Sequence, residues 1–471
     1  MKNKTVRHFV WAGTIAAIMA VMIILTGCGS RNGNDPDTLP TFAPPFTPPT
    51  ELPPLAQSPP TLTVDNLRDF PSLHFTTQVD PFGVARTLWH DAELAINGVQ
   101  VAYALENTAV RLRGRGNSTW LHGPEKRPLR IRFAEPTAVL DATHAARDWV
   151  LIANLFDMTL MRTHLAFVLG DRLGTFPWVP YSQLVHVYIN GEYQGVFQLA
   201  DERDVHPARA DLHFNTNPAY SGFLLEIDGS APSRQRRLDD GEVEGVDFIF
   251  VNGWVIDVRY PRLNQRDNHL DYLRDYLYTV DTAIHAGDFA ALQHLADIPS
   301  MVDFYLVQEW FKDIDGGDRS IFMQLMGTGE TRRLYFGPLW DFDRSAGNLA
   351  YWNTPEHIFI GHYNAWFAAL MDMAEFRALV TARWQEIRHG AVKQTLAYAQ
   401  YLLDHYEVAF DRNFARHDHI FDRTQGEPDW FWLVPEVVRE LDSFRAQVEH
   451  MMGWLYARVL WLDAYFGVEV L

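Results

Sequence analysis

Two acidic stretches contain the residues whose types and spacing best suit catalysis or metal binding. One runs from Lys312 to Ser320 as Lys-Asp-Ile-Asp-Gly-Gly-Asp-Arg-Ser, and the other runs from Trp340 to Asn348 as Trp-Asp-Phe-Asp-Arg-Ser-Ala-Gly-Asn. Carboxylates two residues apart in an extended segment point the same way, so Asp341 and Asp343 could hold one or two hard cations. Magnesium or manganese suits such oxygen ligands best.

A plainer interpretation is that these aspartates cap helices and bind turn amides, which is the commoner role of an isolated Asp-X-Asp pair. Here, however, the two stretches flank one short predicted hairpin, formed by Ser320 to Leu325 and Arg333 to Phe336. They also lie among apolar residues, where unpaired charges are costly and mutual repulsion would raise carboxyl pKa values. A bound cation would remove that cost.

Basic residues gather upstream in two segments, Arg111 to Ser118 and Lys126 to Arg132. Alternation along strands would place several of these cations on one sheet face, and Gly114 and Gly116 permit close approach of the backbone to an anion. Taken alone, the pattern favours a solvated strand face paired with acidic residues. Basic residues in one half and acidic residues that could bind a metal in the other are what an enzyme needs to transfer a phosphoryl group from a metal-bound nucleotide. Catalysis of that reaction depends on positioning and charge neutralisation.

The predicted secondary structure that must position these residues changes along the chain from mainly strands to mainly helices. Residues 63–267 read as a sheet-rich lobe in which Asn190-Gly191 marks a hairpin, and Asp157 to Leu173 has helical spacing. The predicted strands are Ala109 to Gly116, Arg127 to Phe133, Leu184 to Ile189, Tyr193 to Leu199, Phe223 to Ile227 and Val246 to Val251.

Residues 268–471 read as a helix-rich lobe that also carries the short hairpin, which makes the predicted fold class α+β. Ser300 is the expected N-cap of the helix that leads into the first acidic stretch. The helical segments expected from the 3.6-residue period are Leu270 to His285, Met301 to Lys312, Glu375 to His405 and Trp430 to Phe466.

Bulk composition limits the class of protein. With 471 residues and 47% hydrophobic content, the chain can bury one large core or two lobes. The formal charge of -19 argues against a nucleic-acid partner, because a phosphate backbone would be repelled. Cys28 is the single cysteine, which excludes an internal disulfide and a thiolate zinc site.

The N-terminus is typical of an export signal. Lys2, Lys4 and Arg7 precede an apolar run from Phe9 to Leu25, which is short for a membrane span. The run ends in Leu-Thr-Gly-Cys, which resembles a bacterial lipobox, so residues 1–27 are predicted to be a lipoprotein signal peptide and Cys28 to be lipidated. A signal anchor that happens to contain a cysteine is the alternative.

A linker is predicted to follow the lipidated cysteine. Residues 28–62 are rich in Pro, Thr, Asp and Ser, a composition that forms no core. Repeated proline pairs favour polyproline II, which makes a semi-rigid spacer. Two or more acyl chains anchor a protein stably, so we expect the protein to be exported and lipid-anchored at the outer face of the bacterial cytoplasmic membrane.

Six segments, in order along the chain, resemble the CotH family of atypical protein kinases, which was first associated with spore coats. Together they cover roughly Leu73 to His389, and the combination is far more specific than any one segment. The segments are Arg113-Gly114-Arg115-Gly116-Asn117-Ser118, Lys126 to Ile131, Val187 to Phe197, Leu225-Glu226-Ile227-Asp228, Asp313 to Gly316 with Ser320, and Pro338 to Asp343 with Gly347-Asn348.

The resemblance implies a two-lobed kinase-like fold that uses ATP with magnesium or manganese. It implies that Asp315 is the catalytic base and that Asp341 ligates metal in the place of the aspartate of the kinase DFG motif. Asp343 and Asp318 are secondary metal candidates. The remaining implied residues are Lys126, acting on nucleotide phosphate and in catalysis, Arg113, Arg115, Asn117 and Ser118 at the nucleotide, and Glu202 as a partner that orients Lys126.

The chain departs from the family pattern in two places. Arg127-Pro128-Leu129 replaces a more usual Lys-Ser-Tyr-like run, and Gly317-Asp318-Arg319 is an acidic variant of a commonly basic stretch. Neither departure removes a candidate catalytic group, but both bear on the choice of substrate.

Three functions remain open from the sequence. The first is transfer of the γ-phosphate of ATP to Ser or Thr of exported, spore or cell-surface proteins, which would be the protein partners. The second is a non-catalytic, lipid-anchored surface binding module on the same fold. The third is a carbohydrate hydrolase, which would need two carboxylates at a fixed separation.

Overall fold

The computed structural model describes most of the chain after the predicted linker. The described residues are 69–468, apart from 84–85, 99–102, 124–125, 234, 238–242, 265, 351–352, 423 and 425–426. The predicted signal peptide, Cys28 and the proline-rich linker lie outside the described residues.

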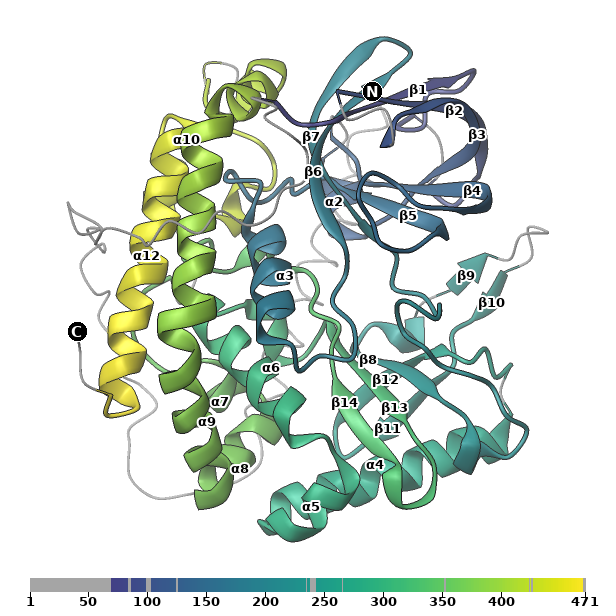
Figure 1. Cartoon of the computed structure of the whole chain (residues 1–471), viewed down its shortest axis with the longest axis vertical. Helices are drawn as coiled ribbons and strands as arrows, with labels where there is room; N and C mark the ends of the chain where they lie inside the picture. Colours follow the sequence, from purple (N-terminus) through teal and green to yellow (C-terminus); the bar gives the residue numbers. More distant parts are fainter. Residues whose placement is uncertain are drawn as a thin grey trace, which may run out of the picture. The chain divides into compact units, whose positions relative to one another are not determined.

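The first strands close into a barrel in which neighbours follow the order β1-β2-β3-β4-β5-β7-β6 (Figure 1). Closure comes from parallel pairing between β1 and β6, which are far apart in sequence. Alternating apolar residues such as Leu112, Ile131 and Phe197 fill its interior. The strands are β1 (Ser72–Thr77), β2 (His90–Asn97), β3 (Leu105–Gly114), β4 (Leu129–Thr137), β5 (Ala146–Ile152), β6 (Ser182–Ile189) and β7 (Glu192–Asp201).

The predicted hairpin at Asn190-Gly191 is confirmed. Both residues have positive φ, 51° and 83°, which is the conformation that a two-residue turn between twisted strands requires. The same dipeptide at Asn252-Gly253, with φ of 41° and 94°, joins two further strands and was not used in the sequence-based prediction.

A second, five-stranded sheet has the order β11-β12-β8-β13-β14. It combines strands from both sides of the predicted boundary at 267/268. The predicted hairpin between the acidic stretches forms its β13-β14 edge. Its strands are β8 (Phe223–Ile227), β11 (Phe248–Val251), β12 (Trp254–Tyr260), β13 (Ile321–Met326) and β14 (Arg333–Phe336), and β9 (Gln235–Arg237) pairs separately with β10 (Val243–Gly245).

Helices dominate the second half, as predicted, and pack with the five-stranded sheet in one large apolar core. In Figure 1, α10 and α12 run side by side, and α10 also contacts barrel strand β7. The helices are α2 (Ser118–His122), α3 (Arg162–Leu173), α4 (Asp267–Ala286), α5 (Phe289–Leu295), α6 (Ile298–Phe311), α7 (Ile360–Tyr363), α8 (Ala365–Asp372), α9 (Ala374–Ile387), α10 (Lys393–Arg416), α11 (Glu436–Arg439) and α12 (Phe444–Tyr465).

Several helix starts differ from the prediction. The segment predicted as one helix from Trp430 forms two short turns, Phe431–Leu433 and Glu436–Arg439, and its long helix begins only at Phe444. Helix α3 begins at Arg162 instead of Asp157, because the Asp157 carboxylate accepts hydrogen bonds from the amides of Thr159 and Arg162 and holds a turn there. Ser300 is not the N-cap of α6. Asp297 caps that helix by accepting a hydrogen bond from the Ser300 amide at 2.9 Å, with a proline in the first turn.

The fold class is mixed, with a strand-rich first part and a helix-rich second part, which agrees with the predicted α+β class. Among the helices that the structure describes, none has the length and apolar character needed to cross a bilayer.

Candidate active site

The first acidic stretch forms a tight loop between α6 and β13. Helix α6 ends at Phe311, and Lys312 turns the chain with a positive φ of 50°. Asp313 then caps a 3₁₀ turn, Ile314–Gly317, and accepts a hydrogen bond from the Asp315 amide at 3.4 Å. The loop therefore holds Asp315 between a buried helix and a buried strand.

The second acidic stretch follows β14 and meets the first. Asp341 has a positive φ of 61° and starts a 3₁₀ turn, Phe342–Arg344. The Ser320 hydroxyl lies 3.3 Å from an oxygen of Asp315 and 3.2 Å from an oxygen of Asp341. One serine thus joins the two aspartates of greatest interest. Backbone conformations that side chains rarely adopt, at Ser320 as well as at Asp341, gather at this point, as is common at functional sites.

Burial and mutual repulsion govern the charges of the cluster. Burial first, and the Asp341 charge second, raise the pKa of Asp315 to about 6. Burial followed by repulsion from Asp341 and Asp315 raises the pKa of Asp343 well above its usual range. The pKa values of Asp313 and Asp341 are also raised, mainly by burial. The carboxylates are therefore poised to bind a cation or a proton.

The donor set suits a divalent metal that keeps water and phosphate among its ligands. Within the described ranges, no group of three or more His, Cys, Asp or Glu side chains is gathered tightly enough to enclose a metal ion. Magnesium, however, usually binds through one or two carboxylates together with substrate phosphates. Asp315 and Asp341 provide such a pair, and the buried Oδ2 of Asp313 accepts no hydrogen bond from the described residues.

Asp318 is exposed, unlike the other carboxylates of the two acidic stretches. Its side chain is 61% exposed and pairs with Arg319 at 2.8 Å. Asp343 is half-buried, and its backbone carbonyl accepts a hydrogen bond from Asn348 at 2.8 Å.

Two arginines lie against the ring of Trp340, the residue before Asp341. The guanidinium carbon of Arg203 is 4.4 Å from the ring centroid, and that of Arg115 is 5.5 Å away. Burial lowers the pKa of Arg115, and repulsion from Arg203 lowers it further. Both also interact electrostatically with Asp341. Two cations therefore border the carboxylate cluster, where they could receive phosphate oxygens.

Lys126 packs against the aromatic ring of Phe197 on barrel strand β7. It is buried, with its ammonium 5.1 Å from the centroid of the Phe197 ring, and its charge helps to lower the pKa of His417. Glu202 forms ion pairs with Arg130 at 3.3 Å and with Arg203 at 3.9 Å. Arg130, Arg115 and Arg203 together hold the Glu202 carboxyl ionised, with a pKa well below its usual range despite burial.

The glycine-containing segment after β3 is a packed loop. The Arg86 guanidinium donates to the carbonyl of Gly116 at 2.6 Å and to the Asn117 side chain at 3.2 Å. Ser118 opens the short helix α2 and is exposed. The free side of Gly114 faces the ring of Trp120, so this glycine makes room for an aromatic side chain.

We expect Gly114→Ala to destabilise the protein. A Cβ at this position would lie 2.2 Å from Trp120 and 2.7 Å from the backbone of Arg86. Overpacking of this kind costs about 1–3 kcal/mol, which urea unfolding would measure. Gly390→Ala, at a helical position with open space around the added Cβ, is the matched control and should not destabilise. An equal effect of the two changes would contradict the packing argument.

Three residues without a role in the sequence-based prediction hold the two acidic loops. Arg162 pairs with Asp157 inside the core and donates to the carbonyls of Ser345 at 3.0 Å and Ala346 at 3.2 Å. The Ala346 amide in turn donates to Phe311 at the end of α6. Arg203 and Arg162 were missed because the groups that they contact, Trp340 and the carbonyls of Ser345 and Ala346, are distant in sequence. Asp313 was recognised as part of the first acidic stretch but was given no role.

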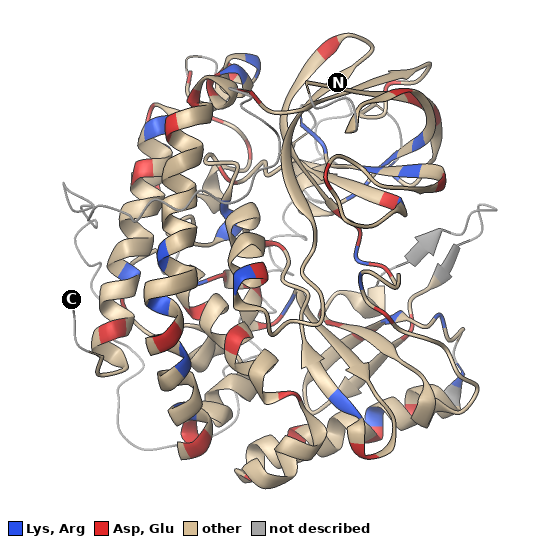
Figure 2. Ribbon diagram, in the orientation of Figure 1, with Lys and Arg blue, Asp and Glu red and all other residues tan. Residues whose placement is uncertain are grey.

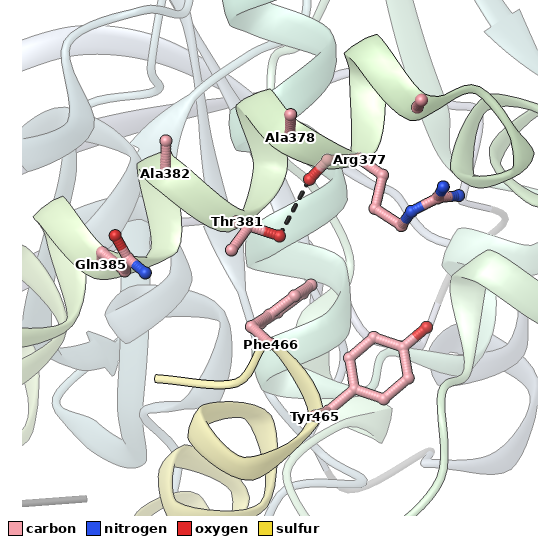
Figure 3. A pocket seen from close by; sticks show the side chains of 8 residues that line it. Arg377, Ala378, Thr381, Ala382, Gln385, Tyr465 and Phe466 are labelled. Carbon is pink, nitrogen blue, oxygen red and sulfur yellow. Dashed lines mark hydrogen bonds between the residues drawn. The ribbon is translucent and has the colours of Figure 1, made fainter. Parts of the chain in front are cut away.

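A surface hollow lies elsewhere, between α9 and the end of α12. Arg377, Thr381, Gln385, Tyr465 and Phe466 are among the residues that line it (Figure 3). It is shallow, and its lining includes no aspartate or glutamate. The acidic loops and the arginines against Trp340 therefore remain the better candidate for catalysis.

Comparison with known proteins identifies the family. A family model described as CotH kinase protein matches residues 112–462. No curated protein matches the chain. The family match covers both acidic loops, the barrel from β3 onwards and the helices into α12, which is well over half of the sequence. The chain therefore belongs to the CotH kinase family.

Proposed function

We propose that this protein is an ATP-dependent protein kinase that transfers the γ-phosphate to Ser or Thr of exported, spore or cell-surface proteins. One observation carries the proposal: Asp315 and Asp341, joined through Ser320, lie beside two arginines that flank Trp340. Carboxylates that can hold a metal next to cations that can hold phosphate are the parts that phosphoryl transfer needs.

Within this proposal, Asp315 accepts the proton of the substrate hydroxyl. A pKa near 6 leaves its carboxylate largely ionised at neutral pH, which suits a general base. Asp341 would ligate magnesium or manganese, with Asp343 as the next candidate and Asp318 as a more distant one. The metal, when bound, would neutralise charge on the phosphates.

The nucleotide phosphates would be held from the barrel side. Arg115, which the family resemblance indicated, and Arg203, which it did not, are the cations placed against Trp340. Lys126, Asn117 and Ser118 remain proposed nucleotide contacts on the resemblance alone. We propose no nucleotide contact for Arg113, which lies against the Trp89 ring. We propose that Glu202 orients cations of the site through its ion pair with Arg130.

The wider proposal is a two-lobed kinase-like arrangement, with the barrel as one lobe and the helices as the other. The enzyme would be anchored by lipid on Cys28 at the outer face of the membrane and would act on surface proteins. Mass spectrometry of the mature N-terminus tests the anchor: a diacylglyceryl-modified Cys28 is expected. An unmodified Cys28 or an intact Met1 would contradict it.

Incubation with γ-labelled ATP, manganese or magnesium, and a serine-containing protein tests the proposed activity. Label should appear on protein serine or threonine with the unaltered chain and should be absent with Asp341→Ala. Nucleotide binding without transfer, or neither, would leave a non-catalytic surface binding module as the better account.

Metal binding should be pH dependent. At pH 7.5, Mn²⁺ at about a hundred times its Kd should stabilise the fold by about 2.7 kcal/mol. Protons compete with the metal for Asp341, whose pKa is raised, mainly by burial, so that its carboxylate is lost at a higher pH than that of an exposed aspartate. The stabilisation should therefore shrink at pH 5.5, as thermal unfolding would show. Asp341→Asn should remove it at both pH values, and a stabilisation that persists in this variant would place the metal elsewhere.

A further inference from the structure

Four arginines share the outer face of the barrel on strands β3 and β4. Arg111 lies directly opposite Arg132 in the ladder, and Arg113 lies directly opposite Arg130. Like charges at opposed positions destabilise an antiparallel pair. In Figure 2, basic segments are visible on these barrel strands. We call these four arginines, with Trp89, the arginine face.

The arginine face is only partly neutralised. Asp148 accepts from Arg130 at 3.1 Å and from Arg132 at 2.8 Å, and Glu202 is 3.3 Å from Arg130. By contrast, Arg113 forms no ion pair with the described residues, and its buried Nε has no hydrogen-bond partner there. Burial and repulsion from Arg130 and Arg132 lower its pKa to about 10. The face therefore carries cationic capacity that the protein itself does not use.

Three of the four arginines lie against the ring of Trp89. The guanidinium carbons of Arg132, Arg113 and Arg111 lie 4.5, 5.0 and 5.5 Å from its ring centroid. Asp91 is opposite Arg111 on β2, yet the structure gives no ion pair between them within the described residues. Stacking on a ring leaves the hydrogen-bonding edges of Arg111 and Arg113 able to meet carboxylates in a forked geometry.

The arginine face continues to the candidate active site through one chain of contacts. Arg130 contacts Glu202, and the next residue, Arg203, lies against Trp340 beside Asp341. A ligand on the face would therefore border the position where a substrate hydroxyl must lie. Because the protein as a whole carries a formal charge of -19, an acidic partner would be repelled over most of its surface and attracted here.

We propose that the arginine face docks an acidic segment, rich in Glu or Asp, of the polypeptide that the enzyme phosphorylates. This inference rests on the proposed kinase function and adds the substrate class. A nucleotide base is a poorer occupant, because guanidinium groups already cover the Trp89 ring.

The test measures peptide binding to the full chain in detergent micelles without ATP. The probe is a fluorescein-labelled peptide in which five glutamates precede a serine, and the control peptide has glutamines instead. We expect the glutamate peptide to bind at least about tenfold more tightly, and this difference should fall with added salt. Equal affinity for the two peptides would overturn the proposal.

Matched variants locate the binding. Arg111→Gln together with Arg113→Gln should weaken binding of the glutamate peptide about tenfold or more. Arg111→Gln alone, at an exposed position, keeps the test valid if the double variant unfolds, and should also weaken binding. Arg274→Gln on α4, another exposed arginine, should not change it. Unchanged binding in the single variant, or displacement of the peptide by ATP with magnesium, would overturn the proposal.

Failure of docking and failure of catalysis are distinguishable. If the glutamate peptide binds but no phosphate is transferred, the docking surface stands and the kinase function falls. If both peptides are phosphorylated with the same kcat/KM, the kinase function stands and the docking surface falls.

Discussion

An Asp315→Asn variant is expected to transfer phosphate about 10²- to 10⁴-fold more slowly than the unaltered chain, the contribution usual for a general base. Asparagine preserves the size of the side chain and can still meet Ser320, which lies 3.3 Å from the native carboxylate. It cannot accept the substrate proton. Single-turnover rates at saturating ATP would isolate this step from nucleotide binding.

The pH profile of the unaltered chain provides a second readout. Activity should rise as the pH increases through about 6, because only the ionised Asp315 can act as a base. Asp318→Asn is the control, since that carboxylate is exposed and paired with Arg319, and its effect should be small. A loss of less than tenfold in Asp315→Asn would show that another group accepts the proton.

Replacing Arg458 by methionine is expected to cost about 3–5 kcal/mol of stability, because it leaves a buried charge unpaired. Arg458 and Glu309 are both 0% exposed and pair at 2.7 Å. Arg458 also donates to the carbonyls of Pro355 and His357, while Glu309 accepts from the amides of Phe359 and Gly361. The pair ties α6, and so the Asp315 loop, to the segment before α7.

Urea unfolding measures this loss. Arg445→Met is the matched control, because Arg445 forms its ion pair with Glu407 at the surface, where such pairs contribute roughly 0–1 kcal/mol. The double change Arg458→Met with Glu309→Gln should recover part of the loss, since it removes the stranded charge. If Arg458→Met costs no more than Arg445→Met, the buried pair does not stabilise the fold.

The sequence-based predictions that the structure confirms rest on patterns among residues that are close in sequence. The Asn190-Gly191 turn, the edge hairpin between the acidic stretches and the long amphipathic helices each depend on residues close in sequence. The strand Phe223–Ile227 was placed with its observed bounds. The predicted helix from Glu375 to His405 is interrupted by a π-helical turn, Arg388–Val392, which apolar spacing does not reveal.

The features that could not be predicted from the sequence depend on contacts between residues far apart along the chain. Closure of the barrel depends on pairing of β1 with β6, and no turn signal marks it. The acidic loops were predicted as one site, but the cation beside them, Arg203, is adjacent only in space to Trp340. For the same reason the ion pairs of Glu202 with Arg130 and Arg203 were not predicted.

A crystal structure of the chain with a non-hydrolysable ATP analogue and Mn²⁺ tests the central claim most directly. That claim is that barrel arginines and loop aspartates meet at one triphosphate. We predict the phosphates between Arg115 and Arg203, and Mn²⁺ on Asp341 with Asp315 beside the γ-phosphate. A nucleotide bound away from Trp340, or a metal that contacts neither aspartate, would contradict the account.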